Sequence, residues 1–239
     1  MGCTTMTVLG ILQARMSSRR LPGKVLAPVL EMPMIQRQIE RIRHATELDK
    51  LVVATSTGRD DDAIAALCEA IGQPCFRGPL DDVLGRFVGA LDKFGPADHV
   101  VRLTADCPLI DWTIIDRCVR DHIAAGSDYT SNAIVRTFPD GLDVEVIRSE
   151  TLRAANAEAQ DRESREHVTP FIHSKPDRFQ IMHVTQPDDL AALRWTVDHP
   201  DDLDFVRAVY ASLYDRNPRF ASDDILNLPF GRRLAPASS

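Results

Sequence analysis

The chain has 239 residues, a length that fits one large domain or a core domain with a subdomain. Hydrophobic residues make up 44% of the sequence, enough for a sizeable buried core, so a wholly disordered protein is excluded. Lys and Arg number 28 against 35 Asp and Glu, and the resulting net charge of -7 argues against general binding to nucleic acid or to an anionic membrane.

The N-terminal residues and the cysteines lead us to expect a cytoplasmic protein. The start MGCTTMTVLG lacks the basic region and the continuous apolar run of a secretory signal, and Met6 stands where a myristoylation motif needs Ser or Thr. The longest apolar runs are far too short to span a membrane. The cysteines are odd in number and form no CxxC pair, so we expect reduced thiols rather than a disulfide framework or a metal site. They are Cys3, Cys68, Cys75, Cys107 and Cys118.

The first half of the chain alternates short apolar runs with longer amphipathic segments. We predict strands at 8–12, 51–54 and 99–103, and helices at 34–45, 60–71 and 82–94. Strands and helices that alternate at this spacing predict a parallel α/β sheet with right-handed crossovers.

The second half is less regular. We predict strands at 128–131, 143–147, 179–184 and 193–197, a turn at 138–141, and helices at 160–173 and 200–214. The predicted organisation is a single α/β domain over 1–232, with a hairpin-and-helix arm inserted at about 128–185, and a loose tail at 233–239.

A cluster of positive charge follows the first predicted strand. Arg15, Arg19, Arg20 and Lys24 lie within one short βα loop, at the edge of the sheet where α/β proteins bind ligands. The loop contains neither a Walker nor a Rossmann glycine pattern. A solvated, flexible loop is one interpretation. The other is a polyphosphate site, in which guanidinium and ammonium groups neutralise phosphate oxygens.

Residues 12–24 resemble the signature (I/L)xARxxSxRLPGK of the cytidylyltransferases that activate sugar acids. That family includes the CMP-KDO synthetases, the acylneuraminate cytidylyltransferases and the SpsF group. Further segments are similar to its motifs, with Ala105 where Gly is common: VVATS, FRGPLDDVLGRF, LTADCPLI, and RWTVD followed by PDDL. The resemblance spans about 8–205, and the DDVLxRF and REHVTPFI segments fit the SpsF group best.

The resemblance implies a fold and an activity. The expected fold is a three-layer α/β structure with a mostly parallel sheet, the GT-A-like fold of nucleotide-diphospho-sugar transferases. The expected reaction transfers CMP from CTP to an acidic sugar or related small metabolite, with release of pyrophosphate, for surface polysaccharide or glycan biosynthesis. The resemblance also implies a homodimer with contacts through the arm. The acidic composition and the short apolar runs predict no nucleic-acid or membrane partner.

Nucleotidyl transfer brings two anions together, which requires charge screening and in-line positioning. The resemblance assigns catalysis to Arg15, Lys24 and Asp106, and makes Asp106 and Asp198 the ligands of Mg²⁺. Each aspartate also suits a helix N-cap, which the residues alone leave open. The expected nucleotide-binding residues are Gln13, Ala14, Arg15, Arg20, Lys24, Ala54, Thr55, Arg77, Thr104, Ala105 and Asp106.

The acceptor side is defined less sharply. Polar residues alternate through the turn and strand after residue 130, and further polar groups follow on the predicted helix at 160–173. The candidate acceptor-binding residues are Asn132, Gly141, Asp143, Glu145, Glu166 and His167. A solvated strand face or hairpin turn explains the first four equally well, and His167 also suits a structural role.

Two alternatives stay open at this point. The first is a nucleotidyltransferase with another nucleoside triphosphate, or with a phosphorylated or phosphonate acceptor, because no residue type here excludes uridine or adenine. The second is a catalytically silent nucleotide-binding protein.

Overall fold

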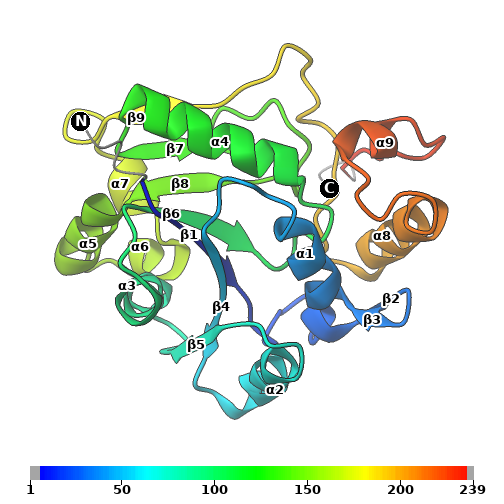
Figure 1. Ribbon diagram of the computed structural model, residues 1–239, viewed down its shortest axis with the longest axis horizontal. Coiled ribbons are helices and arrows are strands. Elements are labelled where there is room, and N and C mark those ends of the chain that lie inside the picture. The colour runs from blue at the N-terminus through cyan, green and yellow to red at the C-terminus, as the bar shows by residue number, and fades with distance from the viewer. Residues whose placement is uncertain (1–5, 236–239) are drawn as a thin grey trace.

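The computed structural model describes residues 6–235, so the predicted thiol Cys3 lies outside the described residues. Its centre is a seven-stranded sheet with the strand order β5-β4-β1-β6-β8-β7-β9 (Figure 1). The strands are β1 (Val8–Gln13), β4 (Lys50–Ser56), β5 (Cys75–Gly78), β6 (His99–Thr104), β7 (Tyr129–Ser131), β8 (Glu145–Arg148) and β9 (Ile181–His183). A separate two-stranded hairpin joins β2 (Pro28–Val29) to β3 (Met32–Pro33).

The first half of the chain forms the parallel part of the sheet, as its alternating pattern predicts. β1 pairs in parallel with β4 and β6, and in both ladders Gln13 is the last registered residue of β1, opposite Ala54 and Thr104. β1 carries apolar side chains on both faces, because helices cover the sheet from both sides. The carboxyl ends of these strands therefore meet at one edge of the sheet, directly before the basic loop.

The second half extends the same sheet with mixed strand directions. β8 runs antiparallel to β6 and β7, while β7 and β9 are parallel. We predicted that residues 128–185 form an inserted arm. These residues contribute the three strands β7, β8 and β9 to the central sheet. The mostly parallel three-layer α/β fold is confirmed.

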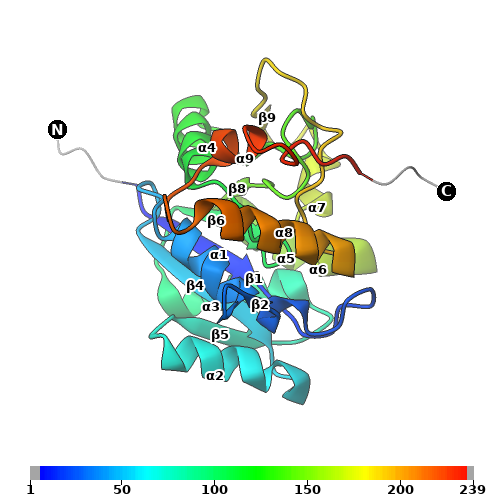
Figure 2. The same cartoon turned by 90° about the vertical axis from the view of Figure 1, so that its right-hand side faces the viewer.

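Helices cover both faces, as the two views show (Figures 1 and 2). The helices are α1 (Met34–Ile42), α2 (Asp62–Ala70), α3 (Val83–Phe94), α4 (Trp112–Ala125), α5 (Ser149–Glu158), α6 (Arg162–His167), α7 (Pro170–His173), α8 (Pro200–Leu213) and α9 (Ser222–Leu226). One apolar cluster joins the sheet to α1, α2, α4, α8 and α9, and a second joins the opposite face to α3, α5 and α7. Within the described residues, no helix is long and apolar enough to cross a membrane.

Two predicted elements differ from the structure. The helix predicted at 160–173 is divided into α6 and α7, because Val168 adopts a positive φ of 73° and Pro170 begins a new helix. The strand predicted at 193–197 forms only isolated bridges. The amides of Trp195 and Thr196 both donate to Asp140 O, at 2.7 and 3.0 Å, so this segment does not build a regular ladder.

The sequence prediction also omitted some regular structure. α4 begins at the N-cap Asp111, whose carboxylate accepts a hydrogen bond from Thr113 N at 2.8 Å, and it buries Ile115 and Cys118.

Near the C-terminal end of the described residues, residues 233–235 of the predicted loose tail are attached to the core. Arg194 N donates to Arg233 O at 2.9 Å, and Ala235 N donates to Ala192 O at 3.0 Å.

Candidate active site

A cavity of about 530 Å³ lies at the carboxyl ends of β1 and β6. Residues from the basic loop, from both strand ends, from α3 and α6, and from the segment before α8 meet there. The lining residues are Gln13, Ala14, Arg15, Ser18, Arg19, Arg20, Lys24, Val25, Val83, Arg86, Arg102, Thr104, Ala105, Asp106, Glu166, His167 and Asp198. Six basic side chains and three acidic ones line it, so the cavity has a positive charge balance within an acidic protein.

The basic loop is folded back on itself by its own backbone. Ser18 N and Gly23 N both donate to Met16 O, at 2.9 and 3.0 Å, and Gly23 supplies the left-handed φ of 73° before a short 3₁₀ helix at Lys24–Leu26. Met16 N donates in turn to the buried carboxylate of Asp61 at 2.7 Å. These bonds hold the backbone, while the side chains of Arg15 and Arg20 are 47% and 57% exposed and therefore accessible to a ligand.

Lys24 is buried between two carboxylates. Its Nζ lies 3.0 Å from Asp198 Oδ1 and 3.6 Å from Asp106 Oδ2, and it donates to Val197 O at 2.5 Å. Arg20 also reaches Asp198 Oδ1, at 2.8 Å. In this state two cations that suit phosphate binding neutralise Asp198, and a triphosphate would compete with the carboxylates for them.

The backbone of Asp106 is fixed and its carboxylate is open. Val197 N and Thr196 Oγ1 donate to Asp106 O at 2.8 and 3.1 Å, which ties the turn after β6 to the segment before α8. The side chain of Asp106 is 36% exposed. Because its backbone is fixed and its carboxylate is exposed, Asp106 is suited to binding a positively charged ligand.

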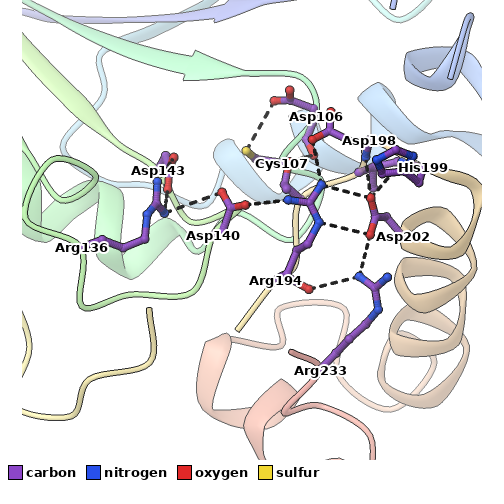
Figure 3. A network of polar contacts seen from close by, with 12 residues as sticks. Asp106, Cys107, Arg136, Asp140, Asp143, Arg194, Asp198, His199, Asp202 and Arg233 are labelled. Carbon is purple, nitrogen blue, oxygen red and sulfur yellow. Dashed lines mark hydrogen bonds and ion pairs between the residues drawn. The ribbon is translucent and has the colours of Figure 1, made fainter. Parts of the chain in front are cut away.

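A network of ion pairs holds the far side of Asp198 (Figure 3). Arg194 Nη2 donates to Asp198 Oδ2 at 2.8 Å, and the same arginine contacts Asp140 at 3.0 Å and Asp202 at 3.3 Å. Burial raises the pKa of Asp198, but the hydrogen bonds and charges of Arg194 and Lys24 outweigh burial and hold this pKa below its ordinary value. Asp198 is thus an ionised carboxylate with one oxygen in the network and the other toward the cavity.

Asp202 anchors that network at the start of α8. Its carboxylate accepts from Asp198 N and His199 N at 2.8 and 2.9 Å, and it pairs with Arg233 at 2.7 Å. Burial again opposes ionisation, but these backbone and arginine hydrogen bonds lower the pKa of Asp202 to about 2. The N-cap role that the sequence left open for Asp198 falls to His199 and Asp202 instead.

The carboxylates fit a metal ion that arrives with a nucleotide. Within residues 6–235, no group of three or more His, Cys, Asp or Glu side chains is placed to hold a metal ion by itself. Mg²⁺ is bound in many nucleotide enzymes by one or two carboxylates, with phosphate oxygens and waters as its other ligands. Asp106 and Asp198, which both contact Lys24 Nζ, can supply these two carboxylates.

The comparisons with known proteins agree with this geometry. Residues 9–212, most of the chain, match the family model of the cytidylyltransferases. The chain belongs to the cytidylyltransferase family. It is therefore a CTP-dependent nucleotidyltransferase, as the resemblance of the basic loop predicts.

Particular relatives refine this placement. The chain is 32% identical over 228 residues to the spore coat polysaccharide biosynthesis protein SpsF of Bacillus subtilis. The matched residues cover 92% of this chain and 93% of SpsF. A cytidylyltransferase structure from Leptospira borgpetersenii superposes with a TM-score of 0.90 at 26% identity, over 98% of this chain and 100% of the other. The structure of CMP:2-keto-3-deoxy-manno-octonic acid synthetase complexed with CTP shares the fold, with a TM-score of 0.66 at 18% identity over 86% and 99% of the two chains.

The structure brings most of the predicted nucleotide-binding residues of this cytidylyltransferase together. Those that line the cavity are Gln13, Ala14, Arg15, Arg20, Lys24, Thr104, Ala105 and Asp106, and the predicted metal ligand Asp198 joins them. The predicted residues Ala54, Thr55 and Arg77 do not line it. Ala54 and Thr55 are fully buried in β4, and Arg77 donates to Ser56 O and Gly58 O at 2.9 and 3.0 Å.

The candidate acceptor residues divide into two groups. Glu166 and His167 line the cavity from α6. Asn132, Gly141, Asp143 and Glu145 do not line it, and each has another structural role.

The second group is held by contacts within the fold. The amide of Asn132 bridges Leu142 O and Val144 N, at 2.8 and 2.7 Å, and Asp143 forms a two-point ion pair with Arg136. Gly141 has a φ of 111°, and a Cβ there would lie 2.5 Å from Thr196 N, so glycine permits this close approach. Glu145 is buried against Arg102.

Two buried arginines of the cavity wall, Arg86 and Arg102, were not predicted as site residues. Arg86 is 2% exposed, and no partner for its Nε exists among the described residues. Burial, with a contribution from Arg15, lowers the pKa of Arg86 to about 10. The DDVLGRF segment contained a signal for Arg86, which is the one charged residue in the apolar run 83–91 after the N-cap of α3. Arg102 interrupts an apolar strand, which is a similar signal.

Proposed function

We propose that this enzyme transfers CMP from CTP to an acidic sugar or related small metabolite and releases pyrophosphate, as a step of surface polysaccharide or glycan biosynthesis. The similarity to SpsF and to a synthetase named for a CMP-linked keto sugar acid supports the acceptor class. The observation that carries the proposal is the position of Lys24, which contacts both Asp106 and Asp198 in a cavity that also contains Arg15 and Arg20.

The reaction requires that an acceptor oxygen attack the α-phosphorus of CTP while the bond to the bridging oxygen of the β-phosphate breaks. The hydroxyl proton leaves with solvent, and the electron pair of the broken bond leaves with pyrophosphate. In this proposal Arg15, Arg20 and Lys24 bind the β- and γ-phosphates and stabilise the departing charge. No covalent enzyme intermediate is needed, because the acceptor itself is the nucleophile.

Asp106 and Asp198 would hold Mg²⁺, which neutralises phosphate charge and orients the reacting groups when it is bound. Gln13, Thr104 and Ala105 form the adjoining wall at the strand ends, where the nucleoside fits. Glu166 and His167 lie on α6, on the same cavity, and are placed to meet the acceptor.

The proposal includes a homodimer. β9 ends the sheet on one side, and a surface hollow beside it is lined by the half-exposed Ile134 together with Ile181 and His183. Size-exclusion chromatography with light scattering tests this part, and a monomer at micromolar concentration would contradict it.

The activity is tested by pyrophosphate release with Mg²⁺, each of the four nucleoside triphosphates, and a panel of sugar acids, neutral sugars and phosphorylated sugars. Mass spectrometry of each mixture detects the CMP adduct. We expect CTP-dependent release with a sugar acid, and its loss in Asp106→Asn. Arg178→Met is the surface control, because Arg178 pairs with Glu158 and does not line the cavity. Activity with UTP alone, or tight CTP binding without turnover on any acceptor, would contradict the proposal.

A further inference from the structure

Arg102 is a guanidinium built into the wall of the cavity from the middle of the sheet. It lies on β6, two residues before Thr104, so both side chains lie on the same face of the strand. The side chain is only 14% exposed, yet it lines the cavity together with Gln13, Asp106 and Glu166. Unlike the exposed arginines of the basic loop, it is mounted on the rigid part of the fold.

Two of the three guanidinium nitrogens of Arg102 have protein partners. Nε donates to Gln13 Oε1 at 3.1 Å, and Nη1 forms an ion pair with Glu145. Glu145 is itself fixed, because the hydroxyls of Tyr129 and Thr169 both donate to its Oε1. Burial opposes charge on both members of the pair, but their mutual attraction outweighs it, so the pKa of Arg102 is raised and the pKa of Glu145 is lowered.

The third nitrogen, Nη2, has no hydrogen-bond partner in the part of the chain that the structure describes. It is not among the buried atoms without a partner, so it keeps access to the cavity. A buried guanidinium whose other nitrogens are anchored loses little conformational entropy when it binds an anion. The remaining N–H donors therefore form a preorganised site for one negatively charged oxygen group.

Resting on the proposed function, we propose that Arg102 recognises a carboxylate of the acceptor and so determines which acceptors the enzyme uses. The phosphates of CTP have their own cations in the basic loop, and Arg102 stands apart from that loop on β6. Glu166 and His167 of α6 border the same cavity and would meet the hydroxyl-bearing part of the acceptor.

The chemistry favours a carboxylate over a phosphate. Only one nitrogen of Arg102 is open, whereas phosphate sites generally combine several donors to neutralise a group of charge near two. Asp106 and Glu166, on the same cavity, also disfavour a second dianion beside the triphosphate. A monoanionic carboxylate fits the single donor and the local charge.

The test measures binding of minimal probes to the full chain with Mg²⁺. Lactate, methyl lactate and inorganic phosphate are titrated with and without a non-hydrolysable CTP analogue, and NMR follows both the probe and the guanidinium signals of Arg102. We expect lactate to bind at least about tenfold more tightly than its uncharged ester, the difference that one charge-assisted hydrogen bond supplies. The signals of Arg102 should shift with lactate.

The matched variant is Arg102→Met combined with Glu145→Gln, because it removes both charges and leaves no buried carboxylate unpaired. We expect it to lose the preference for lactate while its Kd for the CTP analogue stays within about threefold. Arg102→Lys keeps the charge and should retain part of the preference. Arg148→Met is the control, since Arg148 pairs with Asp128 and Glu150 and does not line the cavity.

Several results would overturn the assignment. They are equal binding of lactate and its ester by the parent, a preference that survives in the double variant, the absence of lactate binding, or a preference for phosphate that depends on Arg102. Failure of the CTP analogue to bind would instead contradict the proposed function, and the titrations without nucleotide would still decide the role of Arg102.

Discussion

Two sets of charged side chains meet at Asp198, and they differ in how their charges are compensated. On the cavity side, Arg15, Arg20 and Asp106 are about one-third to more than one-half exposed and have few protein partners. On the other side, Arg194 and Asp202 are 15% and 2% exposed and have several charged or backbone partners each. The first set can exchange partners with a ligand, whereas exchange in the second set would leave a buried charge unpaired.

Arginines and aspartates thus serve two purposes in the same part of the molecule. Open charges on a fixed backbone are suited to binding, because a ligand need not break an existing buried pair. Saturated charges are suited to positioning, because each one restricts its neighbours. Substitutions in the first set should therefore affect activity more than stability, and those in the second set should do the reverse.

The largest expected effect is that of Asp106→Asn. We expect turnover to fall by about 10²–10³-fold, because the substitution removes the open carboxylate that would hold the metal, while the backbone bonds to Asp106 O remain. The measurements are the rate of pyrophosphate release and the thermal midpoint. Near-normal turnover would contradict the role of Asp106 in binding. A fall of the thermal midpoint as large as that of Asp202→Asn would show that Asp106 serves stability instead.

Asp202→Asn should mainly destabilise the protein. Its carboxylate accepts two backbone amides and pairs with two arginines, and breaking such a buried set costs about 3 kcal/mol or more. Thermal unfolding checks this, with Asp204→Asn as the exposed control on the same helix. A loss of turnover without a change in the thermal midpoint would show that Asp202 contributes to activity rather than to stability.

The same variant should change the acid sensitivity of the protein. The pKa of Asp202 is about 2 in the folded state, below an ordinary value of about 3.9, so its stabilisation is present above about pH 4 and is lost as the pH falls toward 2. The parent should therefore lose more stability than Asp202→Asn over this interval. Parallel curves for the two proteins would contradict the assigned pKa direction.

Lys24→Met tests the residue that borders both sets. We expect the KM for CTP to rise about tenfold, because a charged donor to the phosphates is lost. Asp198 keeps Arg20 and Arg194 as partners, so the free energy of unfolding should change much less than in Asp202→Asn. Unchanged CTP kinetics would show that Lys24 is a structural tie between the two carboxylates and does not bind phosphate.

The smallest effect is expected from a buried pair away from both sets. His122 Nε2 lies 3.0 Å from His99 Nδ1, and burial, with smaller contributions from His99 and Arg148, lowers the pKa of His122 to about 3. An unfolded histidine titrates near 6.5, so the unfolded chain binds the extra proton in between, and stability should fall as the pH drops from about 6.5 toward 3. Denaturant unfolding of His122→Gln should show a flatter pH dependence than that of the parent.

The parallel half of the fold and the basic loop could be predicted from sequence, because both are local patterns. Buried parallel strands are short apolar runs, and the cations of the loop lie within a few residues of one another. The division of the helix at Val168 and the irregular course of Trp195 could not be predicted in this way. Both depend on partners remote in sequence, such as Asp140, whose carbonyl takes the amides that a strand would have paired.

The candidate site shows the same limit. The resemblance located Lys24, Asp106 and Asp198, and the fold brings them together. It did not predict the ion pair between Arg102 and Glu145. Alternation along a strand predicts the face on which a side chain lies, but not which residues pack against that face. The site residues seen only in the structure are Arg86 and Arg102. Each is a charged residue within an apolar run, and its role depends on where the fold places that run.

The attachment of Arg233 has a practical consequence for anyone who shortens the protein. Arg233 pairs with Asp202, Asp202 pairs with Arg194, and Arg194 holds Asp198 at the edge of the cavity. A truncation that removes the last few residues, chosen because they resemble a dispensable tail, would take one of the two arginines from Asp202. An expression design that stops before Arg233 would therefore reach into the nucleotide site from the far end of the chain.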